Sequence, residues 1–234
     1  MFILGSSGVG KSTLLETLGL MNNTIEKVDQ FAFSIENGKT QSVDLLWKKS
    51  EKEMAEFRNE HLSFIFQSTN LFSHLSAYEN AILPALIQGK DSRMVRTRAN
   101  SLFKRILSDE VSTKNIAEYS GGQRQRIAFI RALIGKYNVL FADEPTGNLD
   151  SYNADKLMRE IVENVKVEGK TVVVVSHDLK LAMKYSNTLV FINRESDGEK
   201  DKEGNTTFHG IIKKSSTYRK NTQGFWDNKT GVQF

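Results

Sequence analysis

The sequence predicts an α/β fold with a mainly parallel sheet covered by helices on both faces. Short apolar runs typical of buried strands occur at 62–66, 139–142, 171–175 and 188–192. Helical patterns alternate with them at 12–20, 91–108, 123–134 and 152–165. The chain has 234 residues and 39% hydrophobic content, which suits one core with a smaller subdomain.

The first element is a phosphate-binding loop that follows an apolar run at 2–4. Its candidate nucleotide contacts are Gly5, Ser6, Ser7, Gly8, Val9, Gly10, Lys11, Ser12 and Thr13. The glycines let backbone N–H groups bend toward a polyphosphate, and the next helix adds its positive end. We expect Lys11 to reach the β- and γ-phosphates as a catalytic residue and Ser12 to bind Mg²⁺. This motif predicts a P-loop nucleotide site for ATP.

A second motif ends the apolar run at 139–142 with Asp143 and Glu144. A buried parallel strand carries such carboxylates to the sheet edge where α/β proteins bind ligands. Asp143 can then hold the metal, and Glu144 is the natural general base for a hydrolytic water. Two acidic residues after a strand are a common surface feature by themselves, and the phosphate loop is what makes them functional candidates.

A third motif consists of Ser120, Gly121, Gly122 and Gln123, which open a helix. Ser120 and the adjacent backbone amides form a second anion-binding helix N-terminus. One chain does not need two such sites for a single nucleotide. With this motif the sequence resembles the ATP-binding cassette (ABC) ATPases. The resemblance implies a head-to-tail homodimer, in which Ser120 of one copy closes over the γ-phosphate held by the other.

Further family motifs follow in the expected order. The resemblance implies that Gln67 touches Mg²⁺ and the attacking water, that Asp150 in the segment 147–150 crosses the dimer interface, and that His177 contacts the γ-phosphate as a catalytic residue. A single Gln or His is usually an ordinary structural residue, and the register with the other motifs favours function here. We interpret the remaining histidines as structural, and these are His61, His74 and His209.

Several short stretches are similar to ATPases of the lipoprotein-releasing, macrolide-exporting and cell-division group (LolD, MacB and FtsE), namely 57–59, 64–67, Leu75, 78–80, 83–84 and 144–150. The resemblance implies an ATPase domain at 1–193 with a helical subdomain at about 68–119, and a C-terminal extension at 194–234 with a possible extra strand. It also implies that the Gln67 loop and 71–80 receive a coupling helix of a permease. Leu71, Phe72 and Leu75 fit the subdomain core and a partner contact equally well.

No apolar run approaches the length of a membrane span, and nothing before the loop could act as a signal peptide. We therefore expect a cytoplasmic protein bound to the inner face of the membrane through integral-membrane permease subunits. The absence of cysteine excludes disulfides and thiolate metal sites. A net charge of +4 indicates solubility more than nucleic-acid binding. A DNA-repair ATPase of this family is not expected, because no long coiled coil separates the phosphate loop from the signature.

Three functions stay open at this point. The chain can energise an exporter or lipoprotein extractor, regulate cell division without transport, or act as a catalytically weak nucleotide-sensing module. The third arises because Met1 lies four residues before Gly5, whereas related ATPases carry an aromatic residue upstream that stacks on adenine. We expect the natural protein to start earlier. If Met1 is the true start, weak turnover and an exposed strand edge at 30–35 are expected.

Two smaller features depart from the family pattern. Tyr119 stands where the family usually has Leu, which leaves the phosphate contacts at 120–122 intact. The stretch 194–205 has alternating charges and two glycines and is predicted to be a flexible connection. After it, 206–212 has strand character, and Phe225 and Trp226 match no family motif, which favours an appended strand over a functional site.

Overall fold

The structure is a computed structural model that describes residues 1–22, 31–35, 40–107, 114–200 and 206–228. The helices are α1 (Lys11–Leu18), α2 (Val43–Leu46), α3 (Glu51–His61), α4 (Ala77–Ile87), α5 (Ser92–Leu107), α6 (Gly121–Ile134), α7 (Ser151–Glu168) and α8 (Leu179–Tyr185). The strands are β1 (Phe2–Gly5), β2 (Ala32–Ser34), β3 (Thr40–Ser42), β4 (Leu62–Ile65), β5 (Val139–Asp143), β6 (Thr171–Ser176), β7 (Thr188–Lys200), β8 (Thr206–Ile211), β9 (Thr217–Lys220) and β10 (Trp226–Asn228).

The central strands form a parallel sheet in the order β7-β1-β6-β5-β4. In this register Ile3 lies opposite Val175 on one side and Val190 on the other, so β1 is an interior strand. Strands β9 and β10 extend the sheet beyond β7 in antiparallel fashion, and β8 pairs with β7 outside the main path. The predicted mainly parallel sheet is confirmed.

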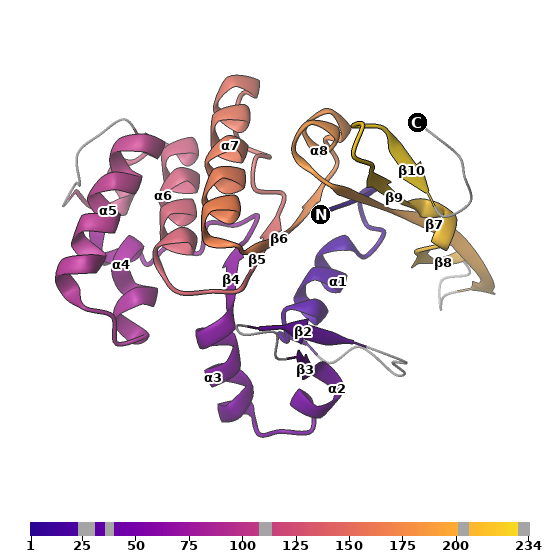
Figure 1. The fold of residues 1–234 in the computed structure, drawn as a ribbon, viewed down its shortest axis with the longest axis horizontal. Helices are drawn as coiled ribbons and strands as arrows, with labels where there is room; N and C mark the ends of the chain where they lie inside the picture. Colours follow the sequence, from indigo (N-terminus) through magenta and orange to yellow (C-terminus); the bar gives the residue numbers. More distant parts are fainter. Residues whose placement is uncertain (23–30, 36–39, 108–113, 201–205, 229–234) are drawn as a thin grey trace.

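Each central strand divides its side chains between two hydrophobic cores, because successive residues of a strand point to opposite faces. In β5, Leu140 and Ala142 pack in the core that contains helices α4 to α7. Val139 and Phe141 pack in the other core, with α1, α2 and α3. Truncating a buried Phe such as Phe141 typically costs about 3–5 kcal/mol. Helices therefore cover both faces, as predicted. Figure 1 shows α4, α5 and α6 gathered at the end of the molecule away from β7 to β10.

Helix boundaries follow from local capping. Helix α6 begins two residues earlier than predicted, because Ser120 and Gln123 form a reciprocal capping box before it. Helix α7 ends at Gly169, whose φ of 62° suits glycine. Helix α3 was absent from the predictions, although Ser50 and Glu53 form the same capping box at its start and carry the signal in the sequence.

The predicted flexible connection at 194–205 is wrong over the described part, because β7 continues to Lys200 and pairs with β8. Backbone hydrogen bonds hold this strand pair without the apolar alternation that reveals a buried strand. Residues 201–205 lie outside the described residues. The C-terminal segment adds three strands, with Trp226 buried in the core and Phe225 exposed. The division of the chain at 193 stays a prediction.

Strand β2 has a partner on one edge. It pairs antiparallel with β3, with Ala32 opposite Ser42, in a separate two-stranded sheet. Phe33 is buried and its ring lies 5.4 Å from that of Phe31 and 5.7 Å from that of Phe57. The expected exposed strand at 30–35 is therefore partly covered, and residue 30 is outside the described part.

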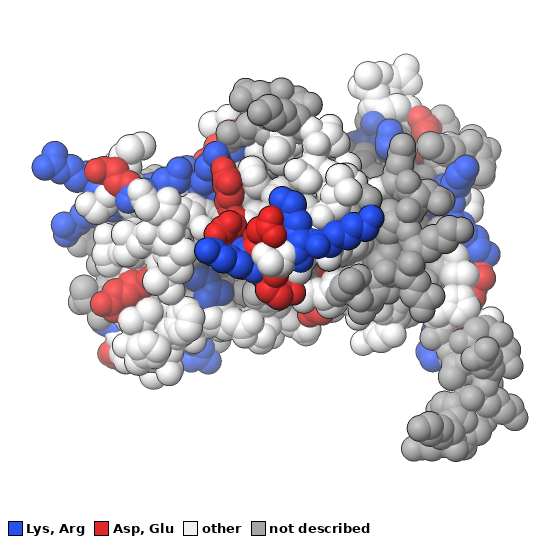
Figure 2. Space-filling view, turned by 90° about the horizontal axis from the view of Figure 1, so that it is seen from below, with Lys and Arg blue, Asp and Glu red and all other residues white. Residues whose placement is uncertain are grey.

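The face seen from below in Figure 2 carries acidic and basic side chains next to one another at its centre, where α3 lies. Ion pairs here join Lys49 to Glu53 at 3.6 Å and Arg58 to Glu51 at 3.8 Å. The charges are mixed on this face, which is typical of an ordinary solvated surface. Within the described residues, no helix has the length and apolar character needed to cross a membrane.

Candidate active site

The phosphate loop is shaped by its glycines. Gly8 and Gly10 have φ values of 74° and 93°, in the left-handed region that residues with a side chain rarely adopt. At Gly5, a Cβ atom would lie 2.9 Å from Val9 Cγ1 and 3.0 Å from the carbonyl oxygen of Ile192. The loop therefore needs glycine for two reasons, backbone conformation at positions 8 and 10 and close packing at position 5.

Lys11 is held inside this loop. Its side chain is buried, and its Nζ donates to the carbonyl oxygens of Gly5 and Ser6, both at 3.0 Å. The ammonium group carries three hydrogens, so the pair of carbonyl bonds leaves one for a ligand. The loop thus presents a fixed positive charge at the start of α1, where the helix dipole also favours an anion.

The loop opens into a cavity of about 550 Å³ that unites the separate sequence motifs. The residues that line it are Ser7, Gly8, Gly10, Lys11, Ser12, Thr13, Gln67, Asp143, Glu144, Gly147, Asn148 and His177. Most of the predicted site residues are therefore brought together. Gly147 and Asn148 were predicted only as part of a dimer contact. The backbone bond from Gly147 N to Glu144 O (3.1 Å) folds this turn back toward the acidic pair.

Asp143 ends β5 beside the loop and receives a hydrogen bond from the Ser12 side chain. Burial raises the pKa of Asp143 above its ordinary value, and the Ser12 bond opposes this shift. Its Oδ1 atom is buried and has no hydrogen-bond partner among the described residues. A carboxylate oxygen that lacks a partner, next to a hydroxyl group, suits a hard cation, so Ser12 and Asp143 fit Mg²⁺.

Glu144 and His177 form a pair at the same cavity. The Oε2 atom of Glu144 lies 2.9 Å from His177 Nδ1; the glutamate side chain is mostly buried and that of the histidine is 73% exposed. Glu144 has a φ of 44°, and its backbone N–H donates to Val175 O at 2.9 Å. A residue other than glycine in this conformation costs about 1–3 kcal/mol, and such strain is concentrated at functional sites.

The signature residues lie elsewhere on the chain surface. Among the described residues that line the cavity, none comes from 120–123, and Asp150 is also absent. Ser120 and Gln123 cap α6, while Asp150 caps α7 by accepting from Asn153 N at 2.9 Å, a bond that lowers the pKa of Asp150. The two motifs are neighbours, because a Cβ on Gly122 would lie 3.4 Å from Leu149 Cδ2. Their nucleotide contacts stay predictions.

The three remaining predicted loop residues, Gly5, Ser6 and Val9, are not among the described residues that line the cavity. Gly5 and Ser6 instead offer the carbonyl oxygens that hold Lys11. Of the histidines predicted to be structural, His61 Nδ1 lies 2.8 Å from Asn138 Oδ1, and its ring centroid lies 4.6 Å from that of Phe57, with the two rings tilted. His61 ends α3 and Asn138 directly precedes β5, so this contact joins the two elements at the amino-terminal end of β5, away from the phosphate loop.

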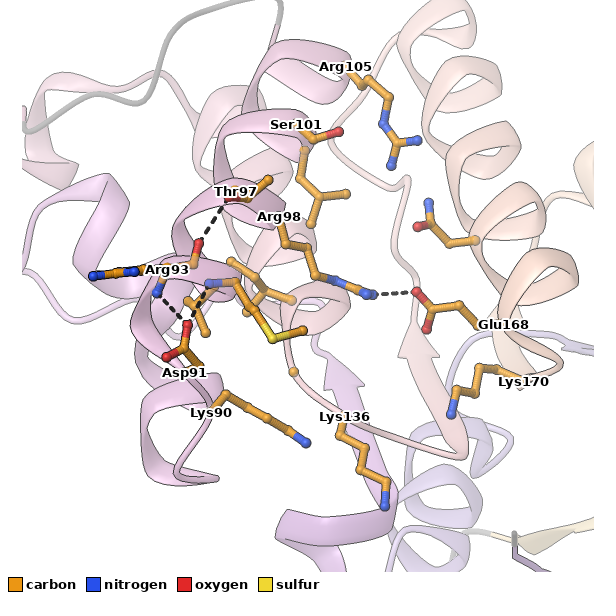
Figure 3. A pocket seen from close by; sticks show the side chains of 16 residues that line it. Lys90, Asp91, Arg93, Thr97, Arg98, Ser101, Arg105, Lys136, Glu168 and Lys170 are labelled. Carbon is orange, nitrogen blue, oxygen red and sulfur yellow. Dashed lines mark hydrogen bonds and ion pairs between the residues drawn. The ribbon is translucent and has the colours of Figure 1, made fainter. Parts of the chain in front are cut away.

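A larger cavity of about 760 Å³ lies between α5 and α7, and no predicted site residue is among its described lining (Figure 3). Arg98 reaches across it to Glu168 Oε1 at 2.6 Å, and also donates to the carbonyl oxygen of Leu133. Arg105 Nε lies 3.4 Å from Glu160 Oε2. Two arginines of this cavity, Arg98 and Arg105, are therefore paired with carboxylates of the same chain.

Comparison with known proteins identifies the family. The model of the ABC transporter family matches residues 1–147. The lipoprotein-releasing system ATP-binding protein LolD of Zymomonas mobilis is 35% identical over 186 residues, which is 78% of this chain and 74% of that protein. The macrolide export ATP-binding/permease protein MacB of Shewanella oneidensis is 38% identical over 180 residues, 77% of this chain but only 26% of MacB.

Solved structures agree. The bacterial ABC transporter cassette MJ0796 has been seen as a dimer and in a post-hydrolysis state with ADP and Pi. Each structure matches with a TM-score of 0.68 at 31% identity, over 81% of this chain and 79% of the other. The parallel sheet, the cavity that brings the sequence motifs together, and these similarities show that this chain belongs to the ABC transporter family, as an ATP-binding and ATP-hydrolysing cassette of the LolD and MacB type.

Proposed function

We propose that two copies of this chain bind MgATP head to tail and hydrolyse it to drive integral-membrane permease subunits in lipoprotein release or export. The observation that carries this proposal is the convergence of Lys11, Glu144 and His177 on one cavity. The names of LolD and MacB support the membrane role, and the dimeric MJ0796 cassette supports the paired state. This assembly would place the chain on the cytoplasmic side of the membrane, bound through the permease.

In the hydrolysis step, Lys11 and the loop N–H groups hold the phosphates, and Glu144 accepts a proton from the attacking water. The water oxygen bonds to the γ-phosphorus as the bond to the bridging oxygen breaks, which yields ADP and phosphate. The 2.9 Å contact between His177 Nδ1 and Glu144 Oε2 holds the carboxylate in position. The imidazole of His177 would then face the γ-phosphate. Ser12, Gln67 and Asp143 would hold Mg²⁺, which neutralises charge on the β- and γ-phosphates.

The other half of the site would come from a second copy. Ser120, Gly121 and Asp150 are exposed, and helix α6 begins at the signature with its positive end outward. Ser120 Oγ accepts from Gln123 N, so its own hydrogen can donate to a phosphate oxygen. An exposed anion-binding surface apart from the phosphate loop is what a shared, two-copy site requires.

The loop after Gln67 supports the permease contact. Asn80 is fully buried; its side chain accepts from Phe72 N at 2.8 Å and donates to the carbonyl oxygens of Phe72, Leu75 and Ser76. This network holds Phe72 with 46% of its surface exposed, while Leu71 packs against the core. We therefore assign Leu71 to the subdomain core and Phe72 to the surface that receives a coupling helix.

The substitution Gly121→Val tests the head-to-tail arrangement. A Cβ on Gly121 would meet no described atom within 4 Å, so the fold should persist and ATP should still bind. We expect turnover to fall at least about tenfold, because the valine would occupy the space that a γ-phosphate needs. Ala55→Val, an exposed change on α3, is the matched control. Normal turnover by Gly121→Val, with binding and melting temperature unchanged, would show that the signature does not close on a nucleotide.

A further inference from the structure

We infer that Gln125, a buried side chain on helix α6, is a positioning residue that holds the turn carrying Glu144 and so fixes the place of the general base. The inference rests on the proposed role of Glu144. The Nε2 atom of Gln125 donates a hydrogen bond to the carbonyl oxygen of Pro145 at 2.6 Å. Pro145 directly follows Glu144, so this bond acts on the backbone beside the base.

Glu144 needs such support because its backbone is strained. Its φ of 44° lies in the left-handed region, which a residue with a side chain keeps only where the surrounding contacts impose it. Two backbone bonds restrain it, from Glu144 N to Val175 O at 2.9 Å and from Gly147 N to Glu144 O at 3.1 Å. The bond from Gln125 to Pro145 restrains the same turn, and it comes from a side chain. A single substitution can therefore remove it and leave the backbone bonds in place.

The burial of Gln125 indicates that its amide group serves more than packing. Gln125 is 1% exposed, and Pro145 is buried as well. The amide oxygen Oε1 is buried and has no hydrogen-bond partner among the residues that the structure describes. A buried polar atom without a partner lowers stability, so an apolar side chain of similar size would serve folding at least as well. What glutamine adds at this position is the donor to Pro145.

Helix α6 is a firm support for this side chain. The residues at 127–130, which follow Gln125 on the helix, are all buried in it. At the start of the helix, a Cβ on Gly122 would lie 3.4 Å from Leu149 Cδ2, so the backbone of α6 packs closely on the segment that follows Pro145. A side chain on a well-packed helix can hold its partner with the precision that a catalytic group requires.

Loss of this bond should change the rate of hydrolysis more than the binding of ATP. Gln125 is not among the described residues that line the cavity, so it would act through the turn and not on the nucleotide. Proton transfer to Glu144 requires hydrogen-bond contact with the water, and a small displacement of the base therefore lowers the rate. Lys11, which would bind the phosphates, is held by different groups, the carbonyl oxygens of Gly5 and Ser6.

The substitution Gln125→Met tests this assignment, because methionine fills a similar volume and removes the donor. We expect kcat to fall about fivefold, while KM and the ATP affinity measured by calorimetry stay within about twofold. Gln88→Met is the matched control. The Nε2 atom of Gln88 also donates to backbone carbonyl oxygens, those of Asn59 at 2.6 Å and Lys136 at 2.8 Å, and Gln88 is not among the described residues that line the cavity. This control should lower the melting temperature and leave kcat unchanged.

A double-mutant cycle separates this inference from the proposed function. Gln125→Met should have little further effect in a Glu144→Gln background, because a positioning residue acts only through the group that it positions. Equal losses of kcat in both backgrounds, an equal loss in Gln88→Met, or unchanged kcat in folded Gln125→Met would overturn the inference while the proposed role of Glu144 stands. Wild-type turnover by Glu144→Gln would instead refute the proposed function.

A second variant keeps the test decisive if Gln125→Met does not fold. Gln125→Asn retains an amide group that is one methylene group shorter, so its donor would no longer reach the carbonyl oxygen of Pro145. We expect the same fall in kcat at unchanged ATP affinity. Full turnover by folded Gln125→Asn would show that the bond to Pro145 does not position the base.

Discussion

The cavities of about 760 Å³ and 550 Å³ both contain basic side chains, and they differ in how those charges are balanced. Between α5 and α7, Arg98 is bonded to Glu168 and to a backbone carbonyl, and Arg105 lies near Glu160. At the phosphate loop, Asp143 keeps a buried oxygen that has no partner among the described residues. The backbone there is also strained at Glu144.

This difference separates structural charge from functional charge. The ion pairs of Arg98 and Arg105 join α5 to α7 within the chain. At the phosphate loop, by contrast, the unpartnered Asp143 oxygen stands next to the strained backbone of Glu144, a combination that favours a bound ligand. We therefore propose that the smaller cavity is the active site and that the larger cavity has a structural role.

Exchanging a glutamate in each cavity should give the largest contrast. We expect Glu144→Gln to lower ATP turnover about 100-fold or more, because the general base is lost, while ATP still binds and traps a closed dimer. Glu168→Gln, in the other cavity, should retain turnover near that of the wild type. Steady-state phosphate release and light scattering with ATP measure both effects, and ordinary turnover by Glu144→Gln would refute the assignment of the base.

Lysines give the next contrast. Lys11→Ala should weaken ATP binding about 100-fold, because a buried ammonium group that faces the phosphates is removed. Lys170→Ala removes a lysine that lines the larger cavity and should leave affinity unchanged. Calorimetry gives both values. Equal losses in the two variants would erase the distinction between the cavities.

Arg98 should affect stability and leave ligand binding alone. Arg98→Ala removes the bonds to Leu133 O and Glu168, in a side chain that is 36% exposed. We expect the free energy of unfolding in urea to fall by about 1 kcal/mol, since solvent screens part of the ion pair. ATP affinity should stay constant. A marked loss of affinity at full stability would place Arg98 in a ligand site after all.

The smallest effect concerns an exposed ion pair between α7 and α8. Hydrogen bonds from the side chains of Lys184 and Tyr185 lower the pKa of Asp155 to about 2. Because the folded pKa lies below the unfolded value, the contribution to stability is present above about pH 4 and is lost as the pH falls toward 2. The melting temperatures of Asp155→Asn and the wild type should therefore converge as the pH is lowered. A difference that grows in acid would contradict this assignment.

The sequence predicted those parts of the fold that depend on local pattern. Apolar runs revealed the parallel strands, since both faces of β5 and β6 are covered. The extension of β7 to Lys200 was missed, because a strand pair outside the core is polar and is held by backbone bonds. Helix α3 was missed although its capping box was readable at Ser50.

For the site, short motifs were enough to predict residues that line one cavity, such as Lys11 and Asp143, and the roles of these residues stay predictions. The left-handed backbone of Glu144 could not be read from residue type, since glutamate rarely adopts it. Asn148 enters the cavity only through the turn that follows Glu144. The close packing of Gly210 against Val9 joins segments far apart in the chain, and no local pattern encodes such a contact.

The interior position of β1 also has a consequence for how the protein is made. Phe2 pairs with Val174 and Leu189, so the strand that leads into the phosphate loop is synthesised long before either neighbour. Such distant pairing slows folding, because a long loop must close before the contact forms. On the ribosome the nucleotide site would be one of the last parts to assemble. An emerging chain would therefore be unable to consume ATP before its sheet is complete.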